Sequence, residues 1–370
     1  MLKLNFFVSA FYCSLCVMMN VASVHANEQS LKVPKMVIED GPYVFKEQSG
    51  LAAVGFCNDT LYHQKLTGTL PLKLTHCRDD MILDRVNFTE QEVLEFNGDF
   101  QVVATSDFHG QYDLMKTLLE NNGVIDQQGH WQFKNGHFVI TGDVFDRGDK
   151  VTEILWFLYR LEQEAEQAGG KLHLLLGNHE VMVLNGDLRY LHPKYVAVAH
   201  RLKHSFEHLY GKGTVLGDWL RTKPVLVKVN NMLFAHGGFH PSLAQEKRSL
   251  KDINQVFKHN LVKAELDQER SGWAQYLHKT NGPIWYRGYF KDNGASSAEI
   301  DLLLSHFDID HLVVGHTSQK QVETRYQGRV IAIDSSIKRG KYGELLMVDG
   351  DQMWRATLRG DKLPLMIKNH

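Results

Sequence analysis

The sequence lacks several features that would place it in a special class of protein. Its 41 lysines and arginines nearly balance 43 aspartates and glutamates, so no positive field suggests a nucleic-acid partner. There is no internal repeat and no low-complexity tract. After the first 19 residues, no second apolar run is long enough to span a membrane. With 43% hydrophobic and 23% charged residues, the 370-residue chain instead suits one large α/β domain with insertions.

Cysteine is also scarce, with four residues that fall into two pairs. Cys13 and Cys16 lie inside the N-terminal apolar run, which argues against a redox role for their spacing. Cys57 and Cys77 remain, and an even pair in an exported protein predicts a disulfide. It would close a loop of about 20 residues and contribute ~3 kcal/mol. The alternative is a pair of unbonded, buried thiols.

The N-terminus predicts a signal peptide. Lys3 precedes the apolar run of residues 4–19, and Val24-His25-Ala26 offers a small-residue cleavage site. We therefore expect cleavage near Ala26 and a mature chain from about Asn27, periplasmic or secreted and free of the membrane. The alternative is an uncleaved anchor, although the run is slightly shorter than the ~20 residues that a spanning helix needs.

Hydrophobic patterns predict a β-rich extension over residues 27–98, followed by alternating strands and helices. Strands are expected at 100–105, 137–141 and 171–176, with amphipathic helices at 111–120 and 151–166 between them. This βαβαβ order predicts a parallel sheet flanked by helices. Later strands are expected at 224–229, 232–235, 311–314, 330–333 and 344–348. Two mostly helical insertions are expected at about 190–211 and 241–309.

Each of the first three strands of that alternating region is followed by a polar block. The blocks are Asp107-Phe108-His109-Gly110, Gly142-Asp143-Val144-Phe145-Asp146-Arg147-Gly148 and Gly177-Asn178-His179-Glu180. Two later histidines, His236 in Ala-His-Gly-Gly and His316 in Val-Gly-His-Thr, also follow apolar runs. Functional loops gather at the carboxyl ends of strands in such sheets, so we expect these blocks to meet.

The residue types in these blocks are those of a two-metal site. Asp107 and His109 are an oxygen and nitrogen pair for one metal, and Asp143 is suited to bridge two. Asn178, His236 and His316 add an amide oxygen and two imidazoles; these mixed ligands suit Mn, Fe, Zn or Co better than Ca. Each block alone is weak, and His316 alone could be a core histidine. Their combination argues against coincidence.

Four further residues fit phosphoryl transfer to water. Arg147 and Arg287 could each grip phosphate oxygens, although Arg287 could also be a solvated or structural arginine. His179 could protonate the leaving group, and Asp146 could hold the required imidazole tautomer.

Together the five blocks resemble the calcineurin-like metallophosphoesterases, within them the phosphoprotein phosphatases, and most of all the Shewanella-like phosphatases. The resemblance spans about residues 100–350 and is most particular over 177–190. It implies an αββα β-sandwich flanked by helices, a catalytic domain over 99–360, and attack on phosphomonoesters by a hydroxide that bridges two metals. It further suggests protein phosphotyrosine or aryl phosphates as substrates.

Carried over residue by residue, the resemblance assigns a role to each candidate. The first metal would be held by Asp107, His109 and Asp143, the second by Asp143, Asn178, His236 and His316, with His179 and Asp146 as the acid pair and Arg147 and Arg287 as the phosphate clamp.

The sequence departs from the family in two places. Ser106 stands where glycine is usual, and we expect it to alter only the local backbone. Residues 333–336 replace the tyrosine-containing loop of the eukaryotic Ser/Thr enzymes, which puts their substrate range in doubt. A dinucleoside polyphosphate or nucleotide hydrolase remains an alternative on the same scaffold, as does a non-catalytic periplasmic protein that binds metal or a phospho-ligand. The lack of a Cys-x5-Arg loop argues against a cysteine-based tyrosine phosphatase.

Overall fold

The structure, a computed structural model, describes residues 37–367 except 49, 78 and 90–92. The predicted signal peptide and its cleavage site near Ala26 lie outside the described residues. Among the residues that are described, no helix combines the length and the apolarity needed to cross a bilayer.

One six-stranded sheet contains the three strands predicted to precede the polar blocks. β7 (Val102–Thr105), β8 (His137–Ile140) and β9 (Lys171–Leu174) are parallel neighbours. On the other side of β7, three strands continue the sheet with antiparallel pairing: β15 (Glu344–Asp349), β16 (Gln352–Thr357) and β17 (Lys362–Pro364). The predicted βαβαβ unit is therefore present, because α1 (Tyr112–Asn121) and α2 (Val151–Gln167) connect its strands.

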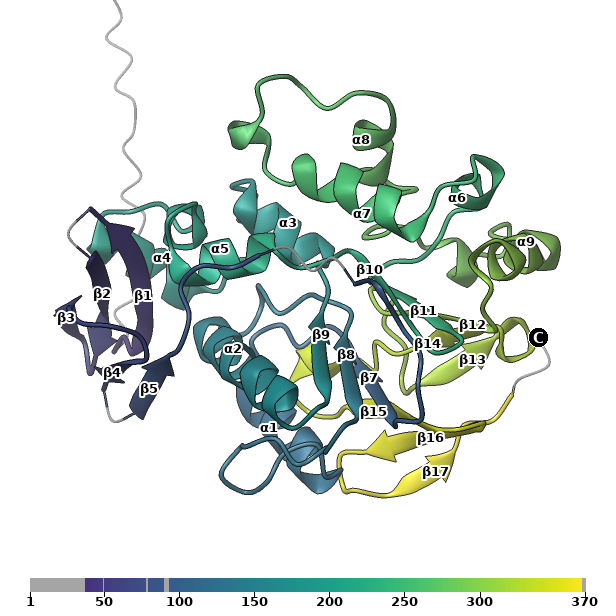
Figure 1. Ribbon diagram of the computed structural model, residues 1–370, viewed down its shortest axis with the longest axis horizontal. Helices are drawn as coiled ribbons and strands as arrows, with labels where there is room; N and C mark the ends of the chain where they lie inside the picture. Colours follow the sequence, from purple (N-terminus) through teal and green to yellow (C-terminus); the bar gives the residue numbers. More distant parts are fainter. Residues whose placement is uncertain (1–36, 49, 78, 90–92, 368–370) are drawn as a thin grey trace, which may run out of the picture. The chain divides into compact units, whose positions relative to one another are not determined.

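A second six-stranded sheet packs against the first (Figure 1). Its strands, in spatial order, are β13 (Glu323–Arg325), β14 (Val330–Ala332), β12 (His311–Val314), β11 (Met232–Ala235), β10 (Leu226–Val229) and β6 (Glu95–Phe96). Side chains from both sheets form one buried cluster that includes Val102, Ala104, Val227, Phe234 and Val313. Successive side chains of a strand point to opposite faces of the sheet, so Val103 and Phe138 point to the face away from the second sheet. Helices cover that face, where α2 contacts β9. The predicted α/β class with a helix-flanked sandwich is confirmed.

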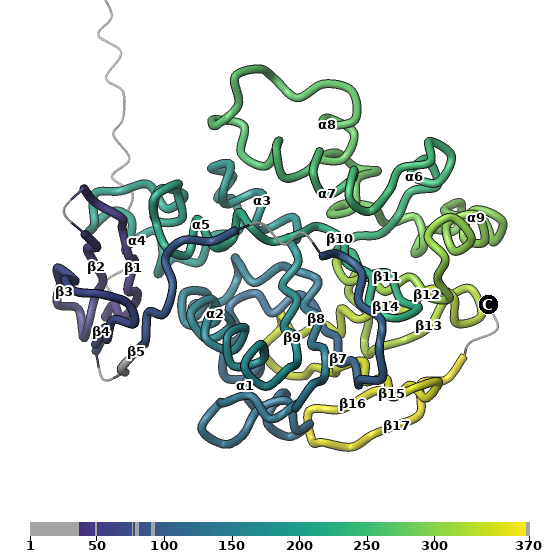
Figure 2. The backbone as a smooth tube through the Cα atoms, in the orientation of Figure 1, coloured from purple at the N-terminus to yellow at the C-terminus, as the bar shows by residue number. Residues whose placement is uncertain are grey.

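The described residues form seven further α-helices. They are α3 (Asn178–Leu184), α4 (Pro193–Leu202), α5 (Val215–Arg221), α6 (Ser242–Gln245), α7 (Leu250–His259), α8 (Gly272–Leu277) and α9 (Ser297–Phe307). Figure 2 traces the stretch from α6 to α9 as one excursion of the chain between β11 and β12. The predicted domain and insertion boundaries stay predictions.

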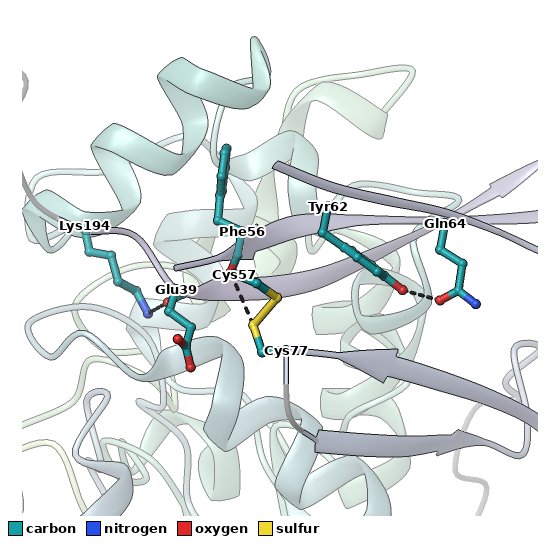
Figure 3. Close-up of a disulfide and its surroundings, with 7 residues drawn as sticks. All are labelled: Glu39, Phe56, Cys57, Tyr62, Gln64, Cys77 and Lys194. Carbon is teal, nitrogen blue, oxygen red and sulfur yellow. Dashed lines mark hydrogen bonds between the residues drawn. A yellow bond between two sulfur atoms is a disulfide. The ribbon is translucent and has the colours of Figure 1, made fainter. Parts of the chain in front are cut away.

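The N-terminal extension forms its own sheet of β1 (Asp40–Glu47), β2 (Gly50–Cys57) and β3 (Thr60–Leu66), followed by the hairpin β4 (Leu72–His76) and β5 (Asp79–Leu83). Cys57 and Cys77 are joined by a disulfide that ties the end of β2 to the β4–β5 turn (Figure 3). The same figure shows Lys194 of α4 reaching the carbonyl oxygen of Glu39, 3.3 Å away.

Buried polar contacts join this extension to the start of α2. The Lys194 ammonium lies 3.0 Å from a carboxylate oxygen of Asp40 in β1. The neighbouring hydroxyl of Tyr195 accepts a hydrogen bond from the Val151 amide at 2.6 Å and donates to the Asp149 carbonyl at 3.0 Å. Asp149 and Val151 flank the N-cap of α2, so these contacts fix where the loop after β8 ends and the helix begins.

Candidate metal centre

Strained backbone marks the loops at the carboxyl ends of the strands. Six of the predicted site residues have φ in the left-handed region: Asp107 (58°), His109 (45°), Asp143 (61°), Asp146 (70°), Arg147 (69°) and His316 (61°). Such conformations cost free energy for residues with a side chain and concentrate at functional sites. The fold therefore holds these side chains in directions that an unstrained loop would not give them.

The loops after β7 and β8 approach each other closely because of two glycines. A Cβ atom on Gly110 would lie 2.6 Å from the Gly148 backbone, and one on Gly148 would lie 2.4 Å from the His109 carbonyl oxygen. The His109 amide also donates to the Asp143 carbonyl at 2.9 Å. This contact brings the first polar block against the second.

Glu180 belongs to the third block and had no predicted role. Its side chain connects the second block to the third through hydrogen bonds. Its fully buried carboxylate accepts hydrogen bonds from the amides of Asp143 (2.8 Å), Val144 (2.7 Å) and Gly177 (2.7 Å). Glu180 is the third residue of α3, and Gly177 is its N-cap. The spacing of a helix capping box was the available signal, because an acid at this position reaches back to the cap.

Asp143 lies at the centre of the site. Its Oδ2 atom is 3.5 Å from His109 Nε2 and 3.2 Å from His236 Nε2. Two sets of side chains therefore share it: potential ligand atoms of His109, Asp143 and His179 lie within 4.8 Å of one another, and so do those of Asp143, His236 and His316. A single carboxylate oxygen thus faces an imidazole on each side, as a bridge between two metals requires.

The other predicted ligands complete the two sets. On one side, Asp107 Oδ1 lies 3.5 Å from His109 Nε2. On the other, His236 Nε2 lies 3.0 Å from Asn178 Oδ1 and 3.1 Å from His316 Nδ1. All six predicted ligands are buried, and the other five lie around Asp143.

The tautomers of two histidines fit metal binding. His109 Nδ1 lies 2.6 Å from the Phe145 carbonyl, and His236 Nδ1 lies 3.0 Å from the Thr141 carbonyl. Because a carbonyl only accepts, each Nδ1 carries a proton, and Nε2 is the ring nitrogen that faces the carboxylates and is left for a metal. The buried Nε2 of His109 has no hydrogen-bond partner among the described residues. This arrangement is the usual support for metal-binding imidazoles.

The electrostatics of the cluster favour positive charge at its centre. Burial alone would lower the pKa of His236, but the carboxylates of Asp143 and Asp107 raise it to about 9. Burial alone would raise the pKa of Asp143, but His236 and His179 hold it well below its usual range. The carboxylates thus stay ionised and stabilise a cation where Nε2 of His236 points.

Ser106 has a larger role than the expected change in local backbone. Its hydroxyl donates to Asp107 Oδ2 at 2.5 Å and accepts from the Thr141 hydroxyl at 2.8 Å. A second hydrogen bond to Asp107 Oδ2 comes from the His316 amide at 3.0 Å. The serine therefore orients the first ligand, and the absence of a side chain at Gly315 leaves room for it, since a Cβ there would lie 2.0 Å from the Ser106 hydroxyl oxygen.

The predicted acid pair is in contact beside the ligands. His179 Nδ1 lies 2.5 Å from Asp146 Oδ2, while His179 Nε2 lies 3.8 Å from Asp143 Oδ2 and 3.4 Å from Nη2 of Arg147. Burial opposes protonation of His179, but the two aspartates outweigh it and raise its pKa. The imidazole is thus held with one nitrogen on Asp146 and the other toward the ligand cluster.

The two predicted clamp arginines come from distant parts of the chain. The Arg147 guanidinium lies 5.3 Å from the ring centroid of Tyr190, and that ring is 5.3 Å from the His179 ring. Nη1 of Arg287 donates to the His316 carbonyl oxygen and to the Thr317 hydroxyl, each at 3.0 Å. Arg287 therefore lies at the rim of the cluster, as do Arg147 and the exposed Tyr190, whose position the sequence left open.

Comparisons with known proteins agree with this geometry. The model of the calcineurin-like phosphoesterase family matches residues 100–320. Shewanella-like protein phosphatase 1 of Plasmodium berghei is 31% identical over 252 residues, which is 65% of this chain and 67% of that protein. Shewanella-like protein phosphatase 2 of Arabidopsis thaliana is 38% identical over 108 residues, 29% of this chain and 28% of that protein. The crystal structure of a cold-active protein-tyrosine phosphatase from a psychrophilic Shewanella is 40% identical with a TM-score of 0.79, over 88% of this chain and 99% of that one.

Proposed function

We propose, from the premise that this chain belongs to the calcineurin-like phosphoesterase family, that it hydrolyses phosphotyrosine in proteins or peptides and related aryl phosphates. Its membership makes it a metal-dependent phosphoric monoester hydrolase. The observation that carries the proposal is the position of Asp143 Oδ2, which faces an imidazole nitrogen on either side, 3.5 Å and 3.2 Å away. The preference for tyrosine is supported by the 40% identity to the cold-active protein-tyrosine phosphatase.

Two divalent metals would be held by the predicted ligand sets. Asp107, His109 and Asp143 would hold one, and the second would be held by Asp143 together with Asn178, His236 and His316. When bound, such metals neutralise phosphate charge and supply a nucleophile from water at neutral pH. The mixed nitrogen and oxygen donors favour Mn, Fe, Zn or Co, and we propose Mn as the first to test.

His179 would donate a proton to the leaving oxygen of the substrate. Its Nδ1 is engaged by Asp146, so the proton available to the substrate is the one on Nε2. Asp146 stabilises the imidazolium and fixes the ring, because its Oδ2 is only 2.5 Å away. The neighbouring aspartates raise the pKa of His179, which favours the protonated form that this transfer requires.

Arg147 and Arg287 would bind the phosphate oxygens. Each offers a planar set of N–H donors that matches a phosphate. Arg147 is positioned by Tyr190, whose carbonyl accepts its amide hydrogen at 3.0 Å and whose ring lies beside its guanidinium. Arg287 reaches the site through its contacts with the backbone at His316.

We also propose that the protein is exported and acts in the periplasm or outside the cell. The support is the apolar run after Lys3, the cleavage pattern at Ala26 and the Cys57–Cys77 disulfide, since disulfides persist in oxidising compartments. Cell fractionation together with the mass of the mature N-terminus tests this proposal. A protein retained in the cytoplasm with Met1 intact would contradict it.

Hydrolysis assays test the proposed activity. The substrates are p-nitrophenyl phosphate, phosphotyrosine and phosphoserine peptides and diadenosine tetraphosphate, each with EDTA and with added Mn. We expect metal-dependent phosphate release that is fastest from the aryl and tyrosyl substrates. Faster turnover of the dinucleotide would instead support a dinucleotide hydrolase, and no turnover with any metal would support a binding protein.

A further inference from the structure

A cavity of about 370 Å³ opens beside Arg287. Its walls come from the loop after β11, from the segment that carries Arg287, and from the first turn of α9. The charged and aromatic residues of these walls include His240, Trp285, Arg287, Lys291 and Glu299. This volume is in the range of pockets that take a small ligand or a few side-chain groups.

The cavity adjoins the metal centre directly. Arg287 lines it while its Nη1 donates to the carbonyl oxygen of the ligand residue His316, 3.0 Å away. Trp285 lines it too, and its ring lies 5.6 Å from the His316 ring. Arg287 thus belongs both to the cavity wall and to the rim of the ligand cluster, so a group in this cavity would lie close to a phosphate held at Arg287.

The cavity wall carries two cations, Arg287 and Lys291. Lys291 has no ion-pair partner in the part of the chain that the structure describes. Two backbone hydrogen bonds hold the turn that carries Lys291. The Gly294 amide donates to the Lys291 carbonyl at 3.0 Å, and the Ala295 amide donates to the Gly288 carbonyl at 3.0 Å. A fixed turn therefore presents an unneutralised ammonium at the cavity wall.

The one carboxylate in the cavity wall, that of Glu299, is engaged through its Oε2 atom. Glu299 caps α9, where it accepts hydrogen bonds from the Ser296 amide at 2.7 Å and the Ser296 hydroxyl at 2.9 Å. His240 adds a donor, since its Nδ1 accepts a hydrogen bond from the Ser242 amide at 3.2 Å and so its Nε2 carries the proton. With Lys291 and Arg287, the cavity wall carries two cations and one carboxylate, a balance that suits an anionic group.

We propose that this cavity, the Lys291 pocket, binds an acidic side chain that lies one or two residues from the phosphotyrosine of a peptide substrate. The inference rests on the proposed function and adds a sequence preference to it. Lys291 would attract the carboxylate, and His240 would donate a hydrogen bond to it.

A charge-swap experiment tests the pocket. Two phosphotyrosine peptides that differ only in Glu or Lys at the residues flanking the phosphotyrosine are compared with wild type and with Lys291→Glu. We expect wild type to prefer the acidic peptide and Lys291→Glu to lower kcat/KM for it by about fivefold or more, while the basic peptide gains. Lys362→Glu, the same charge change on exposed β17, is the matched control and should leave the ratio of the two peptides unchanged.

The outcomes separate the pocket from the activity. If Lys291→Glu changes both peptides equally, or if Lys362→Glu shifts their ratio as much, the pocket assignment is wrong even though p-nitrophenyl phosphate is hydrolysed. If neither aryl phosphate nor peptide is hydrolysed, the proposed function fails. The pocket is then judged by calorimetric binding of the same peptides to Asp143→Asn with and without Lys291→Glu. If Lys291→Glu leaves the Kd of both peptides unchanged in that background, the pocket assignment is wrong.

Discussion

The buried carboxylate of Glu180 accepts a hydrogen bond from the main-chain amide of Asp143 at 2.8 Å, so a residue that binds no metal positions the residue suited to bridge two. The same carboxylate holds the amides of Val144 and Gly177. With the Phe145 amide at 3.3 Å, each oxygen accepts two amide hydrogens, which favours the carboxylate, whereas burial and the neighbouring Asp143 raise the pKa of Glu180. The loop after β8 and the first turn of α3 are therefore joined through one side chain.

Replacing Glu180 with glutamine should destabilise this junction. An amide keeps one acceptor oxygen and turns an NH₂ group toward backbone donors. We expect the free energy of unfolding to fall by about 2–3 kcal/mol, measured by urea denaturation, with kcat lowered at least tenfold. The control is Glu246→Gln at the exposed end of α6, which should leave the free energy of unfolding within about 0.5 kcal/mol of wild type and kcat unchanged. An unchanged urea midpoint for Glu180→Gln would refute the supporting role.

Asp143→Asn should remove the bridging charge and retain the fold. The amide oxygen can still accept the His179 amide hydrogen that Asp143 Oδ1 receives at 2.9 Å, so the loop keeps that contact. The lost negative charge weakens both metal sites. We expect metal content by mass spectrometry to drop and kcat to fall about a thousandfold, a loss of about 4 kcal/mol of transition-state stabilisation, while circular dichroism is unchanged. Full metal content with full activity would contradict the bridging role.

His179→Asn should reveal the proton donor through its dependence on the leaving group. No predicted ligand atom is lost, so metal content should stay at the wild-type level. We expect kcat for an alkyl phosphate such as a phosphoserine peptide to fall about a hundredfold or more. The loss should be smaller for p-nitrophenyl phosphate, whose leaving group needs little protonation. Equal losses on both substrates would argue against acid catalysis. His200→Asn, at an exposed position of α4, serves as the control.

Ser106→Ala should loosen Asp107 without removing a ligand. The serine hydroxyl donates to Asp107 Oδ2 at 2.5 Å, and outer partners of this kind typically change metal affinity by about 10–100-fold. We expect the metal concentration for half-maximal activity to rise about tenfold, while kcat at saturating metal changes little. If the metal titration curves of variant and wild type coincide, the hydroxyl is dispensable.

The Asp40–Lys194–Glu153 contacts predict a pH dependence of stability. Burial and the neighbouring Asp40 raise the pKa of Glu153 to about 7. A carboxyl with a raised folded-state pKa contributes stability that is fully present below about pH 4.5 and lost as the pH rises through about 7. Relative to wild type, Glu153→Gln should therefore gain about 1 kcal/mol between pH 5 and pH 8, a discounted value because the side chain is one-third exposed. Parallel stability curves from urea denaturation at both pH values would contradict this.

Much of the sandwich was predictable because its strands are short apolar runs with clear ends. The predicted strands at 232–235 and 311–314 match β11 and β12, and the helix expected at 151–166 is α2. The N-terminal sheet was harder to predict. β3 is mostly exposed or half-buried and mixes polar with apolar residues, and the pairing of β15 with β7 joins segments more than 200 residues apart, which no local pattern encodes.

The types of the predicted ligands and their order could be predicted from the sequence. The contacts that hold these ligands in position could not. The left-handed φ of Asp107, Asp143 and His316 is imposed by tertiary contacts. The identity of a residue other than glycine does not predict such a backbone conformation. The contact of Ser106 with Asp107 depends on the empty space beside Gly315. Arg287 was found as a motif residue, but only the folded excursion between β11 and β12 shows that it reaches the His316 backbone.

The contacts of Tyr195 have a consequence for where this enzyme can be cut. Its hydroxyl fixes Asp149, two residues after Arg147, and its neighbour Lys194 is paired with Asp40 in the N-terminal sheet. A chain that began at residue 99 would keep every predicted metal ligand and would leave Lys194 without that carboxylate. The stretch of sequence that identifies the family is therefore smaller than the physical unit that keeps the loop of Arg147 in place.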